Sequence, residues 1–177
     1  MMRGAAGALA LLALAGCAMM GGGAGQEYRT VALRDAAGRT VGTALLRPGK
    51  NGVDVTLSVN GLPPGTHGVH FHETGRCDAP DFASAGGHFN PNQKQHGAQN
   101  PAGPHAGDLP NLTVDANQQG FLSGTAAGAA LSGSNAASLR RPRGTALVIH
   151  ATADDLRTDP SGNSGARIAC GVVTPED

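Results

Sequence analysis

Alternation of apolar and polar residues is the clearest pattern in the chain, and it predicts short β-strands. From Val53 to Val59 every second residue is Val or Leu, so four apolar side chains would share one face of an extended segment. Similar short segments, separated by turn residues, cover 28–34, 40–46, 68–72, 112–114, 120–125, 145–150 and 168–173. No segment has the period of a reliable helix. The sequence therefore predicts an all-β fold of about eight strands, an antiparallel sandwich or barrel.

One long interval, residues 73–110, lacks any strand pattern. It is rich in Gly, Pro, Asn and His, and no regular element fits it. A loop of this length without secondary structure is uncommon in a compact domain and usually serves a function. We therefore expect the chemistry of the protein to lie there.

Composition agrees with a strand-and-turn protein and excludes one class of partner. The 177 residues include 28 Gly and 11 Pro but no Trp and one Tyr, so the core must consist mainly of Val, Leu, Ile and Ala. There is room for one domain, assigned to 27–177, and no internal repeat is visible. Lys and Arg together number 13, equal to Asp and Glu, so the chain lacks the basic excess typical of nucleic-acid binding.

The first 16 residues resemble an export signal. Arg3 precedes a short apolar stretch that falls well below the roughly 20 residues needed to span a bilayer. An ordinary cleaved signal peptide is one interpretation. The other rests on Leu14, Ala15, Gly16 and Cys17, which resemble the lipobox of bacterial lipoproteins, whose Cys receives a lipid after cleavage. We then expect residues 17–26 to provide a lipidated Cys17 and a Gly-rich flexible tether, holding the domain on a membrane without crossing it.

Cysteine parity supports the lipid interpretation. An exported protein with 3 Cys leaves one unpaired. If Cys17 carries a lipid, Cys77 and Cys170 remain to form one disulfide in an oxidising compartment. We expect the protein in the cell envelope, in the periplasm. The absence of Asp after Cys17 weakly favours the outer membrane.

The seven histidines point to metal binding, because they are clustered. A single His is more often structural than a ligand, but His70 and His72 are two apart on a predicted strand and so leave the same face. His150 ends another predicted strand. The long loop adds three histidines and a carboxylate: His88, His96, His105 and Asp108. Imidazole and carboxylate ligands suit one or two metals such as copper or zinc, and spacing alone does not assign a His to either metal.

Six blocks in order, 67–73, 87–91, 96–97, 105–111, 150–156 and 165–171, resemble the motifs of the copper–zinc superoxide dismutases. The resemblance runs from about residue 27 to residue 173, which is nearly the whole of the expected mature chain. It implies a Greek-key barrel with long metal-binding loops, one copper and one zinc per subunit, and superoxide as the substrate. It also implies the disulfide between Cys77 and Cys170. Shortened loops are similar to those of bacterial members, whose dimer contacts differ from the animal enzyme's, so a monomer and a homodimer both stay open.

The resemblance implies a role for each candidate metal ligand. Copper would be bound by His70, His72, His88 and His150, and zinc by His88, His96, His105 and Asp108. His88 would bridge the two metals and also carry a proton to the product. His67 matches a structural histidine that is not a ligand.

Two further residues match functional positions of the family. Asp154 matches a carboxylate that links a copper-ligand His to a zinc-ligand His, although taken alone it could be a solvated acid in an Asp-Asp turn. Arg167 matches an arginine beside the open copper position, where a fixed positive charge would attract the superoxide anion.

The expected function is dismutation of superoxide to dioxygen and hydrogen peroxide. The alternative is a periplasmic protein on the same fold that buffers copper or zinc without catalysis, because fold does not imply function. The presence of every ligand and of Arg167 argues against that alternative. A structural surface lipoprotein would leave the ordered histidines unexplained.

Overall fold

The computed structural model describes residues 1–2 and 27–174. The expected tether 17–26, with its lipid on Cys17, and nearly all of the expected signal segment 1–16 lie outside the described residues. Within the described part of the chain, nine strands make up the fold: β1 (Arg29–Asp35), β2 (Thr40–Gly49), β3 (Gly52–Asn60), β4 (Gly65–His67), β5 (Val69–His72), β6 (Leu112–Val114), β7 (Gln119–Ala127), β8 (Thr145–His150) and β9 (Arg167–Val173).

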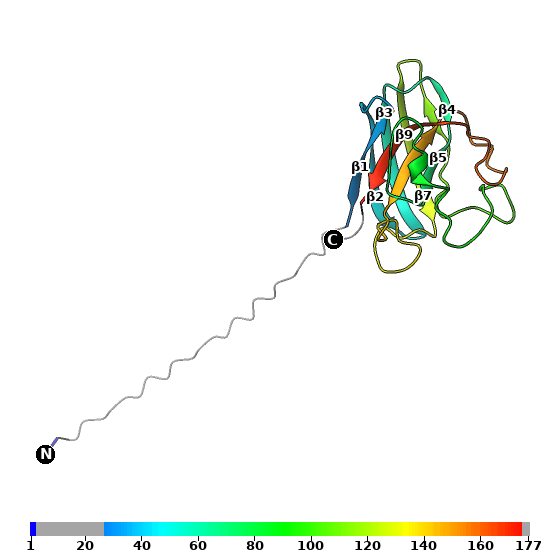
Figure 1. The fold of residues 1–177 in the computed structure, drawn as a ribbon. Coiled ribbons are helices and arrows are strands. Elements are labelled where there is room, and N and C mark those ends of the chain that lie inside the picture. The colour runs from blue at the N-terminus through cyan, green and yellow to red at the C-terminus, as the bar shows by residue number, and fades with distance from the viewer. Residues whose placement is uncertain (3–26, 175–177) are drawn as a thin grey trace.

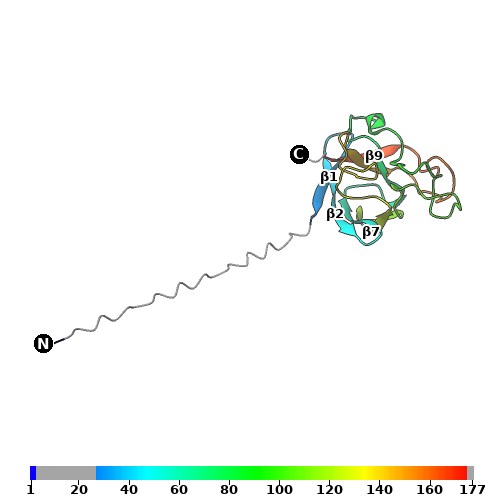
Figure 2. The ribbon, with the colours of Figure 1, turned by 90° about the horizontal axis from the view of Figure 1, so that it is seen from below.

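The strands form a nearly closed antiparallel barrel. Their order is β4-β6-β7-β3-β2-β1-β9-β8-β5, and every neighbouring pair is antiparallel. The two strands at the ends of this order, β4 and β5, are consecutive in the chain, so the sheet returns to its own start. Figure 1 shows the barrel from the side and Figure 2 shows it from below, with the long loops projecting from the same side in both views. The predicted all-β barrel is confirmed.

The strand expected over 68–72 is observed as β5, and a further short strand that was not expected, β4, precedes it. Gly68 separates β4, which pairs with β6, from β5, which pairs with β8. The backbone N–H of Gly68 donates to Thr152 O, and its carbonyl accepts from His150 N–H, so neither group is available to continue a single ladder. A Cβ on Gly68 would lie 2.8 Å from Ser164 Cβ, which explains why glycine occupies this point. The count of about eight strands becomes nine for this reason.

Burial along each strand shows which faces the loops cover. In β3 the side chains alternate between buried and exposed, as the sequence predicted, so its outer face meets solvent. In β5 and β8 every residue is buried. Leu147 and Ile149 of β8 pack into the barrel core, whereas Ala146 and Val148 pack outward against Phe82 and its neighbours. The outer face of this part of the barrel is therefore covered by the long loops.

The loop over 73–110 has little regular structure, as expected. Among the described residues the only helical element is a 3₁₀ turn, Ala83–Ala85. A disulfide joins Cys77 in this loop to Cys170 in β9, with a Cα–Cα distance of 5.7 Å, which confirms the predicted pairing. Over the described residues, no helix is both long and apolar enough to cross a membrane.

Candidate metal centre

Three histidines lie on the outer face of the two fully buried strands. His70 and His72 alternate with Val69 and Phe71 along β5, and β5 pairs in register with β8, which ends at His150. Since side chains of a strand alternate between faces, the two apolar residues enter the core while the histidines face the loops. All three rings are almost completely buried.

The loop brings its own histidines onto this face through backbone hydrogen bonds to β5. Phe71 N–H donates to Gly107 O at 2.9 Å, and Phe89 N–H donates to Phe71 O at 2.8 Å. Gly107 cannot carry a side chain here, because a Cβ would lie 2.6 Å from Phe71 O. His88 and Asp108, each next to one of these contacts, are thereby placed over β5.

We call the first group of donors the strand cluster: His70, His72, His150 and atom Nε2 of His88. Their ligand atoms all lie within 4.8 Å of one another. His72 Nδ1–H donates to Gly86 O at 2.9 Å and His150 Nδ1–H donates to Gly165 O at 3.1 Å, so each ring turns Nε2 inward. These two Nε2 atoms are 3.3 Å apart. The rings are thus oriented by backbone carbonyls before any metal arrives.

We call the second group the loop cluster: His88 Nδ1, His96 Nδ1, His105 Nδ1 and Asp108 Oδ1. Asp108 Oδ1 lies 3.2 Å from His88 Nδ1, 3.1 Å from His96 Nδ1 and 3.4 Å from His105 Nδ1. The Nδ1 atoms of His88 and His105 are 3.4 Å apart. Zinc–nitrogen bonds of about 2.0–2.1 Å place the ligand atoms of a tetrahedral site roughly 3.3 Å apart. The measured distances match the edges of such a site.

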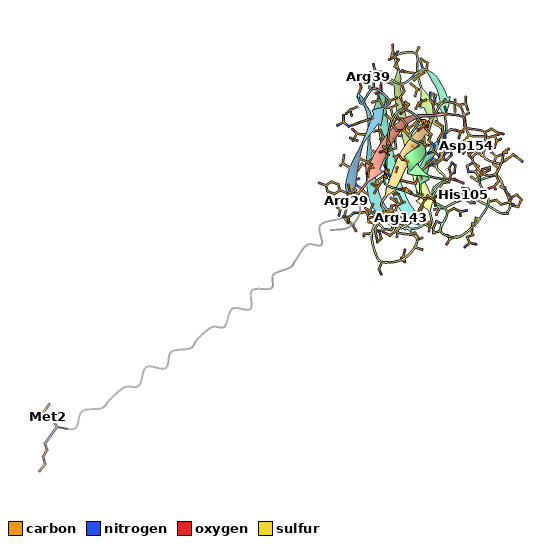
Figure 3. All side chains as sticks on the ribbon, viewed as in Figure 1. Met2, Arg29, Arg39, His105, Arg143 and Asp154 are labelled. Atoms are coloured by element: carbon orange, nitrogen blue, oxygen red, sulfur yellow. A yellow bond between two sulfur atoms is a disulfide. The ribbon has the colours of Figure 1, made fainter. Side chains whose placement is uncertain are left out.

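Asp154 connects the two clusters. Its Oδ2 accepts a hydrogen bond from His70 Nε2–H at 2.8 Å, and its Oδ1 accepts one from His96 Nε2–H at 2.9 Å. Asp154 is buried, whereas the next residue, Asp155, is exposed, so the solvated-turn interpretation fits Asp155 and not Asp154. Figure 3 shows Asp154 and His105 on the side of the barrel where the loops project.

Carboxylates and burial shift the pKa values of individual histidines of the site in opposite directions. Burial lowers the pKa of His150 to about 3 and that of His88 to about 4, although Asp108 partly opposes the shift of His88. Burial would also lower the pKa of His96, but the adjacent carboxylates of Asp108 and Asp154 raise it to about 9. The pKa of Asp108 lies well below its usual range, because its interactions with the rings of His105, His88 and His96 outweigh the effect of burial.

Unpartnered nitrogens show that the donor set fits metal ions. Within the described residues, the buried atoms His70 Nδ1, His88 Nε2 and His96 Nδ1 have no hydrogen-bond partner. A buried polar atom without a partner costs about 1–3 kcal/mol. Three such atoms in the two clusters therefore indicate that each cluster binds a metal ion. Imidazole nitrogens with one carboxylate suit zinc, and an all-imidazole set suits copper.

Arg167 stands beside the strand cluster. Its Nη2 donates to Gly86 O at 2.6 Å, and its Nη1 donates to Phe82 O at 2.6 Å. Gly86 O is the same carbonyl that orients His72, so the guanidinium and a copper-side ring share one anchor. Burial lowers the pKa of the guanidinium from its ordinary value, which still leaves it charged.

His67 stays outside both clusters, in agreement with the prediction that it is not a ligand. Its Nδ1 lies 2.8 Å from His150 O and its Nε2 lies 2.9 Å from Pro63 O. Both ring nitrogens therefore face backbone carbonyls, and neither is directed to a metal. The ring instead ties β4 to the end of β8.

The sequence did not reveal that Asn111 and Gly162 also build the site. The Asn111 amide donates to Asp154 O at 2.8 Å and accepts from Asp154 N–H at 2.9 Å, which fixes the backbone of the connecting carboxylate. A Cβ on Gly162 would overlap Asp154 and lie 2.7 Å from His96 Nε2. Asn111 was visible as the end of the 105–111 block and as the start of an Asn-x-Thr triplet, and neither pattern indicates this contact.

The fold and the two clusters define an all-β protein with adjacent donor sets for two borderline metals that share one histidine. Comparison with known proteins gives the class. Residues 40–173 match the family model described as copper/zinc superoxide dismutase. The chain belongs to the copper/zinc superoxide dismutase family, and copper and zinc are the metals that this family and the two His clusters imply.

Three relatives illustrate the similarity. The chain is 45% identical to superoxide dismutase (Cu-Zn) 1 of Aquifex aeolicus over 84% of this chain and 89% of the relative. It is 44% identical to the superoxide dismutase-like protein YojM of Bacillus subtilis over 81% of this chain and 74% of the relative. The solved structure of Cu/Zn superoxide dismutase from Brucella abortus has a TM-score of 0.66 at 29% identity, covering 83% of this chain and 99% of that one.

Proposed function

We propose that this protein dismutes superoxide at a copper held by the strand cluster, next to a zinc held by the loop cluster. The observation that carries the proposal is the pair of adjacent donor sets at His88. The ligand atoms of the strand cluster lie within 4.8 Å of one another, Asp108 Oδ1 of the loop cluster lies 3.1 to 3.4 Å from three ring nitrogens, and both clusters contain unpartnered nitrogens. Family membership and relatives named superoxide dismutase support the activity.

In this proposal copper is held by His70 Nδ1, His72 Nε2, His88 Nε2 and His150 Nε2. Zinc is held by the four atoms of the loop cluster: His88 Nδ1, His96 Nδ1, His105 Nδ1 and Asp108 Oδ1. Ligand atoms of His70, His88, His96 and Asp108 also lie within 4.8 Å of one another, so His70 is a second candidate for the zinc position. We assign His105 there because its Nδ1 lies 3.4 Å from both Asp108 Oδ1 and His88 Nδ1. His70 Nδ1 is then free for the strand cluster, since its other nitrogen is held by Asp154.

Bound copper supplies the one-electron change by which one superoxide is oxidised to dioxygen and a second is reduced, with two protons, to hydrogen peroxide. The protein's own groups attract the anion and move the protons. Arg167 offers a fixed positive charge beside the strand cluster, anchored by two carbonyls. His88 Nε2, which has no partner among the described residues, could hold one proton whenever it is not bound to copper and donate it to the product, while solvent supplies the other.

In the loop cluster, His88 would bind zinc through Nδ1. Since zinc does not change oxidation state, its role would be to hold this ring and to order the loop. Asp154 would keep the rings of His70 and His96 oriented at the same time. The contact of one carboxylate with both clusters couples the geometry of the two metal positions.

The test is superoxide decay by stopped flow, using the copper- and zinc-loaded protein beside Arg167→Ala. Arg39→Ala is a matched control, because Arg39 is an exposed arginine paired with Asp35 and Figure 3 places it away from His105 and Asp154. Superoxide dismutases are themselves a standard example of steering, in which focused charge raises association rates by about 10- to 1,000-fold, so this scale is taken from the class.

We expect rapid decay that slows in Arg167→Ala, is unchanged in Arg39→Ala and falls with added salt. A protein that binds both metals yet leaves the decay equal to the metal-free blank would contradict the proposal. The copper- or zinc-buffering alternative would then account for the site, in keeping with a relative that is named only superoxide dismutase-like.

We further propose that the protein works in the cell envelope, anchored through a lipid on Cys17. The support is the sequence alone: a short apolar stretch followed by Leu14, Ala15, Gly16 and Cys17. Metabolic labelling with a fatty-acid analogue should mark the wild-type chain and leave Cys17→Ser unlabelled. Label retained in Cys17→Ser, or a wild-type protein recovered wholly in the soluble fraction, would contradict the anchor.

A further inference from the structure

Asp159 is a carboxylate beside the loop cluster to which neither the family resemblance nor the metal assignment gives a role. Its Oδ1 accepts a hydrogen bond from His96 N–H at 2.6 Å. The same oxygen lies 3.7 Å from His105 Nε2. One carboxylate oxygen thus stands between two of the proposed zinc ligands, on the side away from the metal position.

The ring of His105 lacks a close carboxylate partner of the kind that His96 has in Asp154. His105 Nδ1 faces Asp108, so Nε2 is the distal nitrogen and carries the hydrogen when the neutral ring binds a metal. Metal-binding histidines almost always donate that hydrogen to a carboxylate, a carbonyl or water. Asp154 has this role for His96. For His105, which is only 4% exposed, Asp159 is placed to fill it.

The loop that carries Asp159 is held in shape by other contacts. Asp155 accepts hydrogen bonds from the backbone N–H groups of Arg157 and Thr158 at 2.9 and 2.8 Å. Gln99 N–H donates to Leu156 O at 3.0 Å, which ties this loop to the segment after His96. Asp159 therefore does not have to order its own loop, and its carboxylate is available for the two histidines.

The geometry points to Asp159 as a positioning residue of the zinc site, which accepts the His105 Nε2–H hydrogen bond when zinc is bound. The 3.7 Å separation is longer than a direct hydrogen bond. The Asp159 side chain is 48% exposed, so it has room to rotate toward the ring or to contact it through one water. This inference rests on the proposed zinc ligands and extends their support to the outer side of His105.

The test measures zinc affinity by chelator competition in the full chain, with copper absent. Asp159→Asn keeps an oxygen that accepts from His96 N–H but removes the charge opposite His105. Asp155→Asn is the matched control, since it changes a carboxylate of the same loop that contacts no proposed ligand. We expect Asp159→Asn to bind zinc about 10- to 100-fold more weakly, the usual range for loss of such a partner. Asp155→Asn should stay within about twofold of wild type, because it leaves His105 untouched.

A second readout separates positioning from general loop stability. In the zinc-loaded protein the His105 Nε2–H proton should give a slowly exchanging NMR signal, and Asp159→Asn should speed its exchange while the His96 Nε2–H signal stays unchanged. Asp159→Glu should restore zinc affinity at least in part, because it restores the charge.

Three results would overturn the inference: equal zinc affinity in wild type and Asp159→Asn, an unchanged His105 signal, or an equal loss in Asp155→Asn. Failure of the proposed function looks different. In that case the wild-type chain itself would not bind zinc through His88, His96, His105 and Asp108, and none of their ring signals would respond to the metal.

Discussion

The two donor clusters lie side by side but are held by different parts of the molecule. The strand cluster takes three of its histidines from β5 and β8, two paired strands that are buried on both faces. The loop cluster takes all of its donors from residues 88–108, where no strand is assigned, and depends on side-chain contacts with Asp108 and Asp154. The barrel places three residues of the strand cluster, whereas the loop cluster needs polar contacts and, we expect, its metal.

Removal of zinc should produce the largest difference between the two clusters. A ligand present at 1,000 times its Kd stabilises the bound state by about 4.1 kcal/mol, equivalent to about 1,000-fold in local opening. We expect backbone amides of 88–108 to lose hydrogen-exchange protection on this scale in metal-free protein. Amides of β5 and β8 should change little, because ladder hydrogen bonds and the core hold them. Equal loss in both regions would mean that the barrel does not order the strand cluster independently.

Asp154→Asn should weaken the binding of zinc more than that of copper, although Asp154 contacts a histidine of each cluster. The carboxylate accepts two N–H donors, one from His70 and one from His96, whereas an Asn side chain offers one oxygen and turns an NH₂ group toward the other ring. We expect zinc affinity to fall about 10- to 100-fold. Copper affinity should fall less, since β5 still holds His70. Chelator competition for each metal measures both, and a larger loss of copper would contradict the assignment of roles.

The strand cluster was more predictable from sequence than the loop cluster for the same physical reason. Period-two patterning and the spacing of His70 and His72 indicate a shared face, and a strand places that face without further information. The short strand β4 was missed, because its separation from β5 at Gly68 involves hydrogen bonds to Thr152 and His150, which are remote in sequence.

Residues 73–110 were recognised as functional, but their internal geometry was not predictable from local pattern. The contacts that decide it join segments far apart in the chain, such as Asn111 with Asp154 and His96 with Asp159. Only the ordered resemblance to a family supplied the ligand identities, and no such resemblance indicated Asp159. Pairing of Cys77 with Cys170, in contrast, followed from counting cysteines.

Individual histidines of the site should also affect stability in opposite directions as pH changes in metal-free protein. For His88 and His150 the folded pKa is below that of the unfolded chain, near 6.5, so the unfolded state binds more protons and stability falls as pH drops below 6.5. For His96 the folded pKa is raised to about 9, so its contribution is fully present below pH 6.5 and is lost as pH rises through 9.

The free energy of unfolding of metal-free protein should therefore be greatest near pH 6.5. Each group that is neutral in the folded state and protonated in the unfolded state changes the unfolding constant about tenfold per pH unit. Denaturant titrations at several pH values measure this, and NMR titration assigns it to individual rings. A His96 ring that titrates near 6.5 would show that Asp108 and Asp154 do not stabilise its charge.

The smallest effect concerns the approach to the strand cluster. A hollow of about 460 Å³ is lined by Asp81, Ala83, Gly165 and Arg167, among others, and Gly165 is the residue whose carbonyl orients His150. Burial lowers the pKa of Arg167, while the negative charge of Asp81 opposes that shift. A negative charge beside Arg167 should therefore reduce the attraction of an incoming anion.

Asp81→Asn keeps the hydrogen bond from Ala83 N–H that the wild-type oxygen accepts, so the loop should keep its shape. We expect superoxide decay to become about two- to threefold faster at low salt and to approach the wild-type rate as screening shortens the range of the charge. Asp54→Asn on β3, on the part of the barrel that meets solvent, removes the same charge and should leave the rate unchanged. Equal acceleration in both variants would indicate an effect of net charge, and no acceleration in Asp81→Asn would show that the anion reaches the strand cluster without passing this carboxylate.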